Sequence, residues 1–203
     1  MQKIAIFGGT FNPVHWGHLL IAEAALSQKS LDRVLWVTVY PRYKAATILE
    51  FRHRQAMVER AIAPYPNFVL CTPEKHQSIY AIDILFSLQA RYPNSEWYSI
   101  VGLDAFRSLP RWYRSQDLAA QCYWLVAPRR NSDIEGKSSI EKTINYFVQQ
   151  GVKVQWEYLK MPDIEISSSL VRQYCHNSYS IHSLVPETVR AYILEQDLYR
   201  AFF

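Results

Sequence analysis

The chain has 203 residues, of which 49% are hydrophobic and 20% are charged, and its formal net charge is +4. This composition excludes a disordered chain and provides enough apolar residues for a full core, so we expect one domain over residues 1–203. The modest positive charge suits anionic substrates but lacks the clustered basic face of a nucleic-acid-binding protein. We therefore expect no nucleic-acid partner.

The N-terminal apolar run, Ile4–Phe7, is too short for the hydrophobic region of a signal peptide or for a membrane span. The three cysteines, Cys71, Cys122 and Cys175, lie far apart and lack the C-x-x-C spacing of a metal site. Free thiols in a reducing compartment are the simplest interpretation. These features predict a soluble cytoplasmic protein without a membrane partner and without metal-ligating side chains.

Short apolar runs alternate along the chain with longer segments of helical period. The expected strands are Lys3–Phe7, Arg33–Val39, Phe68–Cys71, Trp97–Val101, Tyr123–Ala127 and Val152–Tyr158. The expected helices are Gly17–Ser27, Phe51–Ala63, Ala81–Arg91, Ser139–Gln150, Ser168–Tyr174 and a last one after Pro186. This order predicts an α/β fold with a doubly wound, Rossmann-like, mostly parallel sheet, helices on both faces and a small C-terminal helical part. Ligands bind such sheets beyond the carboxyl ends of the strands.

A glycine pair ends the first expected strand and opens the segment Gly8–His18, which reads GGTFNPVHWGH. Adjacent glycines let the backbone turn sharply and approach a ligand, and the free amides of a helix N-terminus attract anions. His15 and His18 lie three residues apart, so both rings can face one bound group. The segment lacks G-x-x-x-x-G-K-[ST] and G-x-G-x-x-G, which disfavours a Walker-type ATPase and a dehydrogenase. It predicts a phosphate site.

A second candidate anion site lies near the other end, at Ile166–Arg172, which reads ISSSLVR. Serines are good N-caps, so this segment on its own could be only a capped helix. Its hydroxyl groups, its free backbone amides and Arg172 one turn along the helix would also suit a phosphate.

Together the two segments resemble the nucleotidyltransferase superfamily whose hallmark is H-x-G-H after a G-G-T-F-[DN]-P loop, and which also carries I-S-S-[ST]-x-[IV]-R. The resemblance implies that the ATP phosphates are held between the starts of the two helices. Only a fold that unites distant strand ends can bring these segments together, as a doubly wound sheet does. The ATP- and phosphate-binding residues that the resemblance implies are Gly8, Gly9, Thr10, Phe11, Ile166, Ser167 and Ser168.

Several segments in the middle of the chain resemble the nicotinate mononucleotide adenylyltransferase branch of this superfamily: Tyr80–Asp83, Gly102–Phe106 and Leu109–Tyr113. Trp112 and Tyr113 offer faces on which a pyridine ring can stack, and the neighbouring proline turn can present amides to a carboxylate. A packing role for Trp112 and a helix-capping role for Asp104 are the structural alternatives. The implied acceptor-binding residues are Asn12, Tyr80, Ala81, Asp104, Trp112 and Tyr113.

One segment departs from the family pattern P-P-H-K, because Pro41–Lys44 reads PRYK. Lys44 remains to meet an anion, and Arg54 keeps its place in the following helix, but Tyr43 occupies the histidine position. Tyrosine can still donate a hydrogen bond, and Arg42 can add a phosphate contact.

The implied reaction is attack by the phosphate of nicotinic acid mononucleotide on the α-phosphorus of ATP, which gives nicotinic acid adenine dinucleotide and pyrophosphate for NAD synthesis. The attacking oxygen is already anionic, so the protein has to align and stabilise charges rather than supply a base. The residues expected to do this are His15, His18, Lys44 and Arg172. Mg²⁺ is the expected cofactor, bound mainly through the ATP phosphates.

Other functions stay open. The same chemistry on nicotinamide mononucleotide or pantetheine phosphate is the nearest alternative, and the sequence does not decide between a monomer and a homo-oligomer. The tyrosine in the PRYK segment also leaves room for a nucleotide-binding protein with weak catalysis.

Overall fold

The computed structural model describes residues 1–40, 48–72, 80–128 and 135–200, with side chains in the last range from residue 140 onward. Six strands in these ranges form one sheet in the order β3-β2-β1-β4-β5-β6, and every pairing is parallel. The strands are β1 (Gln2–Gly9), β2 (Arg33–Thr38), β3 (Phe68–Cys71), β4 (Ser95–Gly102), β5 (Tyr123–Ala127) and β6 (Gln155–Tyr158). The predicted doubly wound α/β sheet is therefore confirmed.

The strands form because the sheet buries both of its faces. In β2, Val34, Leu35, Trp36 and Val37 are buried in succession, and β5 contains a similar run. Such continuous apolar runs are typical of a parallel strand with helices above and below it. β1 pairs with β2 on one side and β4 on the other, so Phe7 lies opposite both Trp36 and Ile100.

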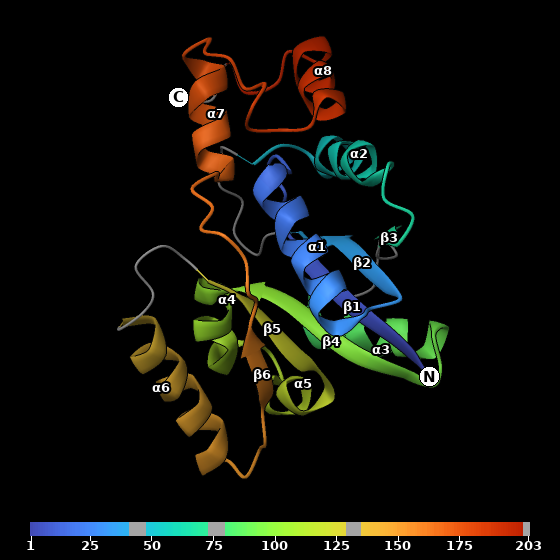
Figure 1. The fold of residues 1–203 in the computed structure, drawn as a ribbon, viewed down its shortest axis with the longest axis vertical. Coiled ribbons are helices and arrows are strands. Elements are labelled where there is room, and N and C mark those ends of the chain that lie inside the picture. Colours follow the sequence, from blue (N-terminus) through green and yellow to red (C-terminus); the bar gives the residue numbers. More distant parts are fainter. Residues whose placement is uncertain (41–47, 73–79, 129–134, 201–203) are drawn as a thin grey trace.

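Helices connect the strands (Figure 1). They are α1 (Trp16–Lys29), α2 (Phe51–Ile62), α3 (Ala81–Arg91), α4 (Leu103–Ser108), α5 (Ser115–Gln121), α6 (Glu135–Gln149), α7 (Ser168–His176) and α8 (Glu187–Glu195), with a 3-10 turn, η1, at Leu109–Arg111. All predicted helices are present, although α6 begins at Glu135 rather than Ser139. The prediction missed α4, α5 and η1, because six, seven and three residues are too few to show a helical period.

Two apolar cores lie on the two faces of the sheet. One core contains buried residues of α1, α2, α7 and α8, including Leu19, Met57 and Val171. The other contains buried residues of α3, α4, α5 and α6, including Leu85, Phe106 and Phe147. Helices therefore cover both faces, as the alternation of elements predicts.

The C-terminal helices α7 and α8 stand at one end of the molecule, next to α2 and the start of α1 (Figure 1). His53 of α2 lies within hydrogen-bond distance of the Tyr192 hydroxyl, at 3.0 Å, and the Arg60 guanidinium lies 4.2 Å from the centre of the Tyr192 ring. Thr188 donates a hydrogen bond of 3.1 Å to the carbonyl of Arg60. The C-terminal part is thus joined to α2 by polar and aromatic contacts.

The chain order of the strands reverses between β1 and β4, which are neighbours in the sheet. Ligands of doubly wound sheets bind at such a switch point, outside the carboxyl ends of the strands.

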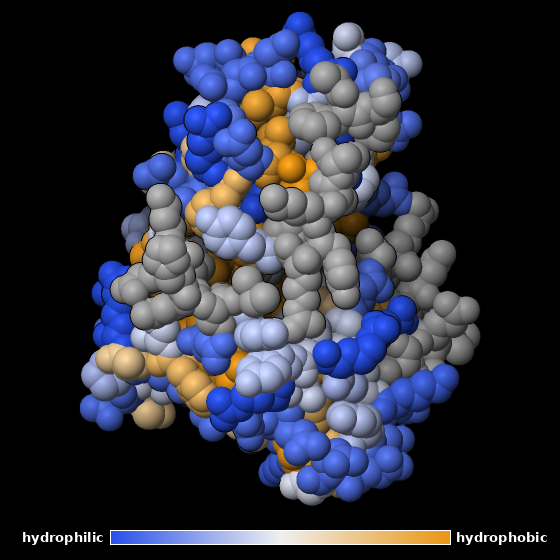
Figure 2. Space-filling model, turned by 180° about the vertical axis from the view of Figure 1, so that it is seen from behind, coloured by the Kyte–Doolittle hydropathy of each residue, from blue (hydrophilic) through white to orange (hydrophobic). Residues whose placement is uncertain are grey.

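Seen from behind, the molecule is largely hydrophilic at its upper and lower ends, with apolar surface between them (Figure 2). No helix in the described ranges is long and apolar enough to cross a membrane. All three cysteines are free thiols, as predicted.

Candidate active site

The loop after β1 turns at Phe11 and not at the glycines. Gly8 and Gly9 are the last residues of β1, and Phe11 has a left-handed φ of 47° with its ring only 2% exposed. A Cβ atom on Gly9 would lie 2.8 Å from two atoms of the Phe11 ring. The sequence interpretation placed the sharp turn at the glycines, and this was wrong, because the left-handed residue is Phe11. Glycine is needed at position 9 for a different reason: the Phe11 ring packs where a side chain would lie.

His15 and His18 meet at the start of α1, where they occupy the N-cap and third helical positions. Their rings stack with centroids 3.7 Å apart. The backbone N–H of His15 donates a hydrogen bond of 3.2 Å to Nδ1 of His18. Since Nδ1 accepts this bond, the ring proton of a neutral His18 is on Nε2, where it can be donated to a ligand.

Burial keeps both rings neutral near pH 7. It lowers the pKa of His15 from 6.5 to about 4. Burial, followed by the influence of His15, also lowers the pKa of His18 well below its ordinary value. Nδ1 of His15 is buried and has no hydrogen-bond partner among the described residues. The pair thus offers neutral hydrogen-bonding groups to a phosphate, without adding a formal positive charge.

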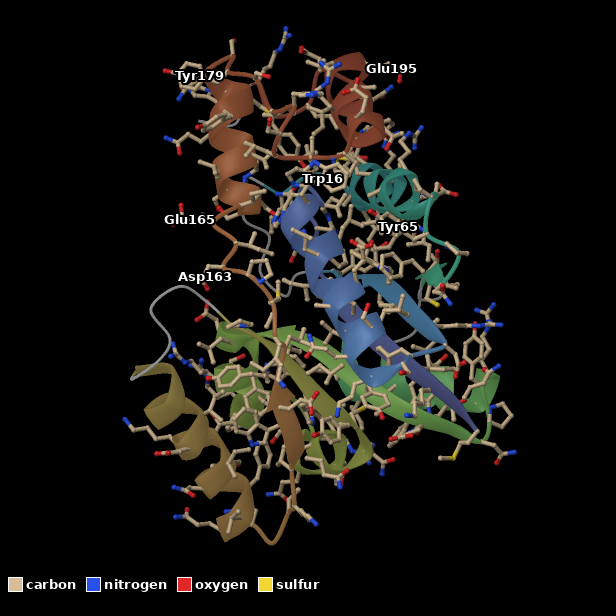
Figure 3. The ribbon with its side chains drawn as sticks, in the orientation of Figure 1. Trp16, Tyr65, Asp163, Glu165, Tyr179 and Glu195 are labelled. Carbon is tan, nitrogen blue, oxygen red and sulfur yellow. The ribbon has the colours of Figure 1, made fainter. Side chains whose placement is uncertain are left out.

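Gly17 is required between the two histidines. A Cβ atom at this position would lie 3.0 Å from Nδ1 of His15 and 3.0 Å from Cγ2 of Ile164. Ile164 belongs to the segment that links β6 with α7, and this segment runs past the N-terminal half of α1 (Figure 3). The neighbouring side chains Asp163 and Glu165 point away from α1 in the same view. The glycine therefore lets this linking segment pack against the histidine pair.

The start of α7 contacts the loop after β1, which brings the two motifs together as expected. Ser167 caps the helix by accepting a hydrogen bond of 3.1 Å from the backbone of Leu170. Ser168 donates a hydrogen bond of 2.8 Å to the carbonyl of Pro13. Arg172 donates one of 2.8 Å to the carbonyl of Asn12, while its Nε is buried without a partner among the described residues. Arg172 thus holds the loop, and its guanidinium group has further N–H groups beyond those used in its two printed bonds.

Two further side chains hold this loop, and the sequence interpretation gave neither of them a role in the site. The buried Arg54 donates to the carbonyls of Thr10, Val39 and Leu49, at 2.6, 3.0 and 3.0 Å. The buried Tyr199 donates a hydrogen bond of 3.0 Å to Oδ1 of Asn12.

A cavity of about 390 Å³ opens from this loop, a volume in the range of small-molecule sites. Four predicted acceptor-binding residues line it together with three predicted phosphate-binding residues: Tyr80, Ala81, Trp112, Tyr113, Gly8, Gly9 and Thr10. The Trp112 indole N–H donates a hydrogen bond of 2.9 Å to the Ser108 hydroxyl, which fixes the ring. The fold therefore joins the phosphate loop to an aromatic wall in one space.

The other predicted site residues lie elsewhere. Asp104 lies in the first turn of α4, 3.7 Å from Arg107, and is not among the described residues that line the cavity. Asn12 is 4% exposed, and its Oδ1 accepts hydrogen bonds from Tyr199 and from the backbone of Leu49, so its acceptor-binding role stays a prediction.

Ile166 and Lys44 are the remaining residues that the sequence predicts for the phosphate site. Ile166 packs against the core on the α1 face. Lys44 and the PRYK segment lie outside the described residues. Among the residues that the structure describes, no three His, Cys, Asp or Glu side chains gather as a metal site.

The sheet order 3-2-1-4-5-6, with the H-x-G-H segment and the serine-capped start of α7 in contact beyond its switch point, agrees with the class of protein that the sequence resembles, the H-x-G-H nucleotidyltransferases. Residues 6–174 match the family model described as cytidylyltransferase-like. A probable nicotinate-nucleotide adenylyltransferase of Trichormus variabilis is 47% identical over 98% of both chains, and one of Synechococcus sp. is 39% identical over 98% of this chain and 97% of the relative. The chain belongs to the nicotinate-nucleotide adenylyltransferase family.

Solved structures support the fold. A Plasmodium falciparum nicotinic acid mononucleotide adenylyltransferase complexed with NaAD superimposes with a TM-score of 0.76 at 21% identity, over 100% of this chain and 99% of the other. The same enzyme complexed with APC gives a TM-score of 0.77 at 20% identity, over the same shares of both chains. At these identities the likeness shows a shared fold.

Proposed function

We propose that the protein transfers the adenylyl group of ATP to nicotinic acid mononucleotide, releasing pyrophosphate and forming nicotinic acid adenine dinucleotide for NAD synthesis. One observation carries the proposal: a single cavity runs from the phosphate loop at Gly8–Thr10 to the aromatic wall at Trp112 and Tyr113. The full-length relatives bear the name of this activity, which agrees with that geometry.

The chain's own groups suit this transfer. A phosphate oxygen of the acceptor forms a bond to the α-phosphorus, and the bond from that phosphorus to the β-phosphate bridging oxygen breaks. The acceptor oxygen is already anionic, so no base is required. The Nε2–H of His18, the remaining guanidinium N–H groups of Arg172 and the backbone amides at the start of α7 can donate to the phosphoryl oxygens. Their contribution is alignment and charge stabilisation.

We propose that Mg²⁺ enters as the MgATP complex. The phosphate site offers imidazole, guanidinium and amide donors, which suit phosphate oxygens, whereas Mg²⁺ prefers oxygen ligands. The phosphates and water would then supply most of the metal ligands. Lys44 is proposed as an additional phosphate contact from its own segment.

The proposal is tested by measuring pyrophosphate release with MgATP and, in parallel reactions, nicotinic acid mononucleotide, nicotinamide mononucleotide or pantetheine phosphate. We expect the acid to give the highest kcat/KM of the three. Higher kcat/KM with either other acceptor would reassign the substrate. Binding of ATP without pyrophosphate release from any acceptor would instead indicate a nucleotide-binding protein.

A further inference from the structure

One charged side chain stands in the wall of the cavity. Of the described residues that line it, Arg111 alone carries a charge, and the others are glycines, apolar and aromatic residues, one cysteine and two hydroxyl residues, Thr10 and Ser99. A cation at the edge of an otherwise uncharged cavity favours a ligand with a negative group at that place.

The neighbouring arginines are each paired with an acid, whereas Arg111 has no acidic partner in the part of the chain that the structure describes. Arg107 lies 3.7 Å from Asp104, and Arg114 lies 2.7 Å from Asp117. Arg111 forms no ion pair and no side-chain hydrogen bond with any described residue. Among the three arginines at positions 107, 111 and 114, Arg111 is therefore the one without an acidic partner in the described ranges.

The backbone that carries Arg111 is firmly held. It is the last residue of η1, and the next residue, Trp112, donates its backbone N–H to the carbonyl of Leu109 at 3.0 Å. Leu109 is fully buried, and the Ser115 hydroxyl donates to the carbonyl of Pro110 at 3.3 Å. The arginine thus projects from a fixed turn, directly beside the aromatic wall.

The other negative group of the acceptor has its own site. The phosphate belongs at the loop after β1 and at the start of α7, where His18 and Arg172 have donors for it. The anion left for a cation next to Trp112 is the carboxylate on the pyridine ring. A guanidinium group can bind a carboxylate through two parallel hydrogen bonds, whereas a carboxamide cannot accept both.

We propose that Arg111 is a specificity-determining residue that pairs with the ring carboxylate of the acceptor and so selects the acid over the amide. This inference rests on the proposed function, because it assumes a pyridine mononucleotide as acceptor. Arg111 is exposed, so solvent screens the pair and limits its effect to about twofold to fivefold in specificity.

The test compares kcat/KM for nicotinic acid mononucleotide and nicotinamide mononucleotide in the wild type, in Arg111→Gln and in Arg111→Lys. We expect Arg111→Gln to lower the acid-to-amide ratio about twofold to fivefold, through a higher KM for the acid and unchanged KM for ATP. Arg111→Lys keeps the charge but loses the planar fork, so its ratio should be intermediate. Arg114→Gln removes a nearby positive charge that is already paired and should leave the ratio unchanged.

The outcomes separate the inference from the proposed function. An equal loss for both acceptors in Arg111→Gln would place the arginine at the shared phosphate and overturn the inference, as would an unchanged ratio. A wild type without preference for the acid would contradict the proposed function itself. Thermal unfolding and the KM for ATP show whether each variant keeps its fold, and equilibrium binding of each mononucleotide without ATP gives a second measure of the ratio.

Discussion

The hydroxyl group of Tyr199 donates a hydrogen bond of 3.0 Å to the side-chain oxygen of Asn12, so the C-terminal segment contacts the loop that follows the first strand. The same oxygen accepts a bond from the backbone N–H of Leu49. Burial raises the pKa of Tyr199 well above 10, so its hydroxyl stays protonated and remains a donor near neutral pH. The C-terminal segment thus helps to hold the loop of the proposed active site.

Removing this hydroxyl should affect catalysis as well as stability. In Tyr199→Phe, Oδ1 of Asn12 loses the hydrogen bond from the tyrosine hydroxyl, and we expect about 1–3 kcal/mol of lost unfolding free energy. Because the loop carries the histidine pair, kcat should fall about tenfold, a loss of about 1.4 kcal/mol in transition-state stabilisation. Urea unfolding and steady-state kinetics measure the two effects.

Tyr192→Phe is the matched control. It also removes a hydroxyl of the C-terminal part, but that hydroxyl lies at 3.0 Å from His53, between α8 and α2. Its stability should fall while kcat stays near the wild-type value. An equal loss of kcat in both variants would mean that the tyrosine acts only through general stability.

His18→Ala should abolish most turnover while the protein stays folded. The variant loses the Nε2–H donor, and loss of one donor to a developing oxyanion typically costs about 10²–10³ in kcat. Pyrophosphate release gives the rate, and circular dichroism checks the fold. His176→Ala, which removes an exposed imidazole from the other end of α7, serves as the control. Normal kcat in His18→Ala would refute the assignment.

Gly17→Ala should reduce activity more than stability. The added methyl group meets Nδ1 of His15 and Cγ2 of Ile164, each at 3.0 Å, while alanine gains up to about 1 kcal/mol of helix propensity over glycine. The two effects oppose each other in the unfolding free energy, which should change by less than about 1 kcal/mol. Displacement of His15 should still lower kcat at least about tenfold.

A second substitution identifies the contact that matters in Gly17→Ala. Ile164→Ala in the same chain removes one of the two contacts and leaves the other, with His15, in place. Activity that stays low in the double variant supports displacement of the histidine. Full recovery would instead assign the loss to Ile164.

Stability should fall as the pH drops below about 6.5. A folded-state pKa of about 4 for His15 means that the unfolded chain binds more protons between these values, so acid favours unfolding. Each histidine of lowered pKa contributes about 1.4 kcal/mol per pH unit across its window, and the contribution is constant above about pH 7.5. His15→Asn should show a shallower loss in urea unfolding between pH 6.5 and 4.5. An unchanged slope would contradict the assignment.

The sequence predicts the sheet well because its strands are continuous apolar runs with helical segments between them. It misses α4 and α5, since Leu103–Ser108 and Ser115–Gln121 are stabilised by packing and turn geometry rather than by a readable period. Local motifs also predict the histidine pair and the capped start of α7. The turn is different: its left-handed residue is Phe11, whose conformation depends on the aromatic core around its ring.

The sequence did not indicate roles for Tyr199 and Arg111, because both depend on residues that are brought together only by the fold. Tyr199 reaches Asn12 across almost the whole chain, and no local pattern reports such a pair. Arg111 looks in the sequence like any surface arginine. Its importance appears only when the cavity wall is known and its neighbours are seen to be paired with acids.

The guanidinium group of Arg54 gathers carbonyl groups from three separate segments: the loop after β1, the end of β2 and the approach to α2. If one of the three segments moves away, the buried guanidinium group loses a hydrogen bond and its charge is poorly solvated. We therefore expect the three segments to open together by local unfolding. Their backbone amides should therefore exchange hydrogen with solvent as a single cooperative unit. We therefore expect the three segments that contact Arg54 to unfold and refold together as one small unit.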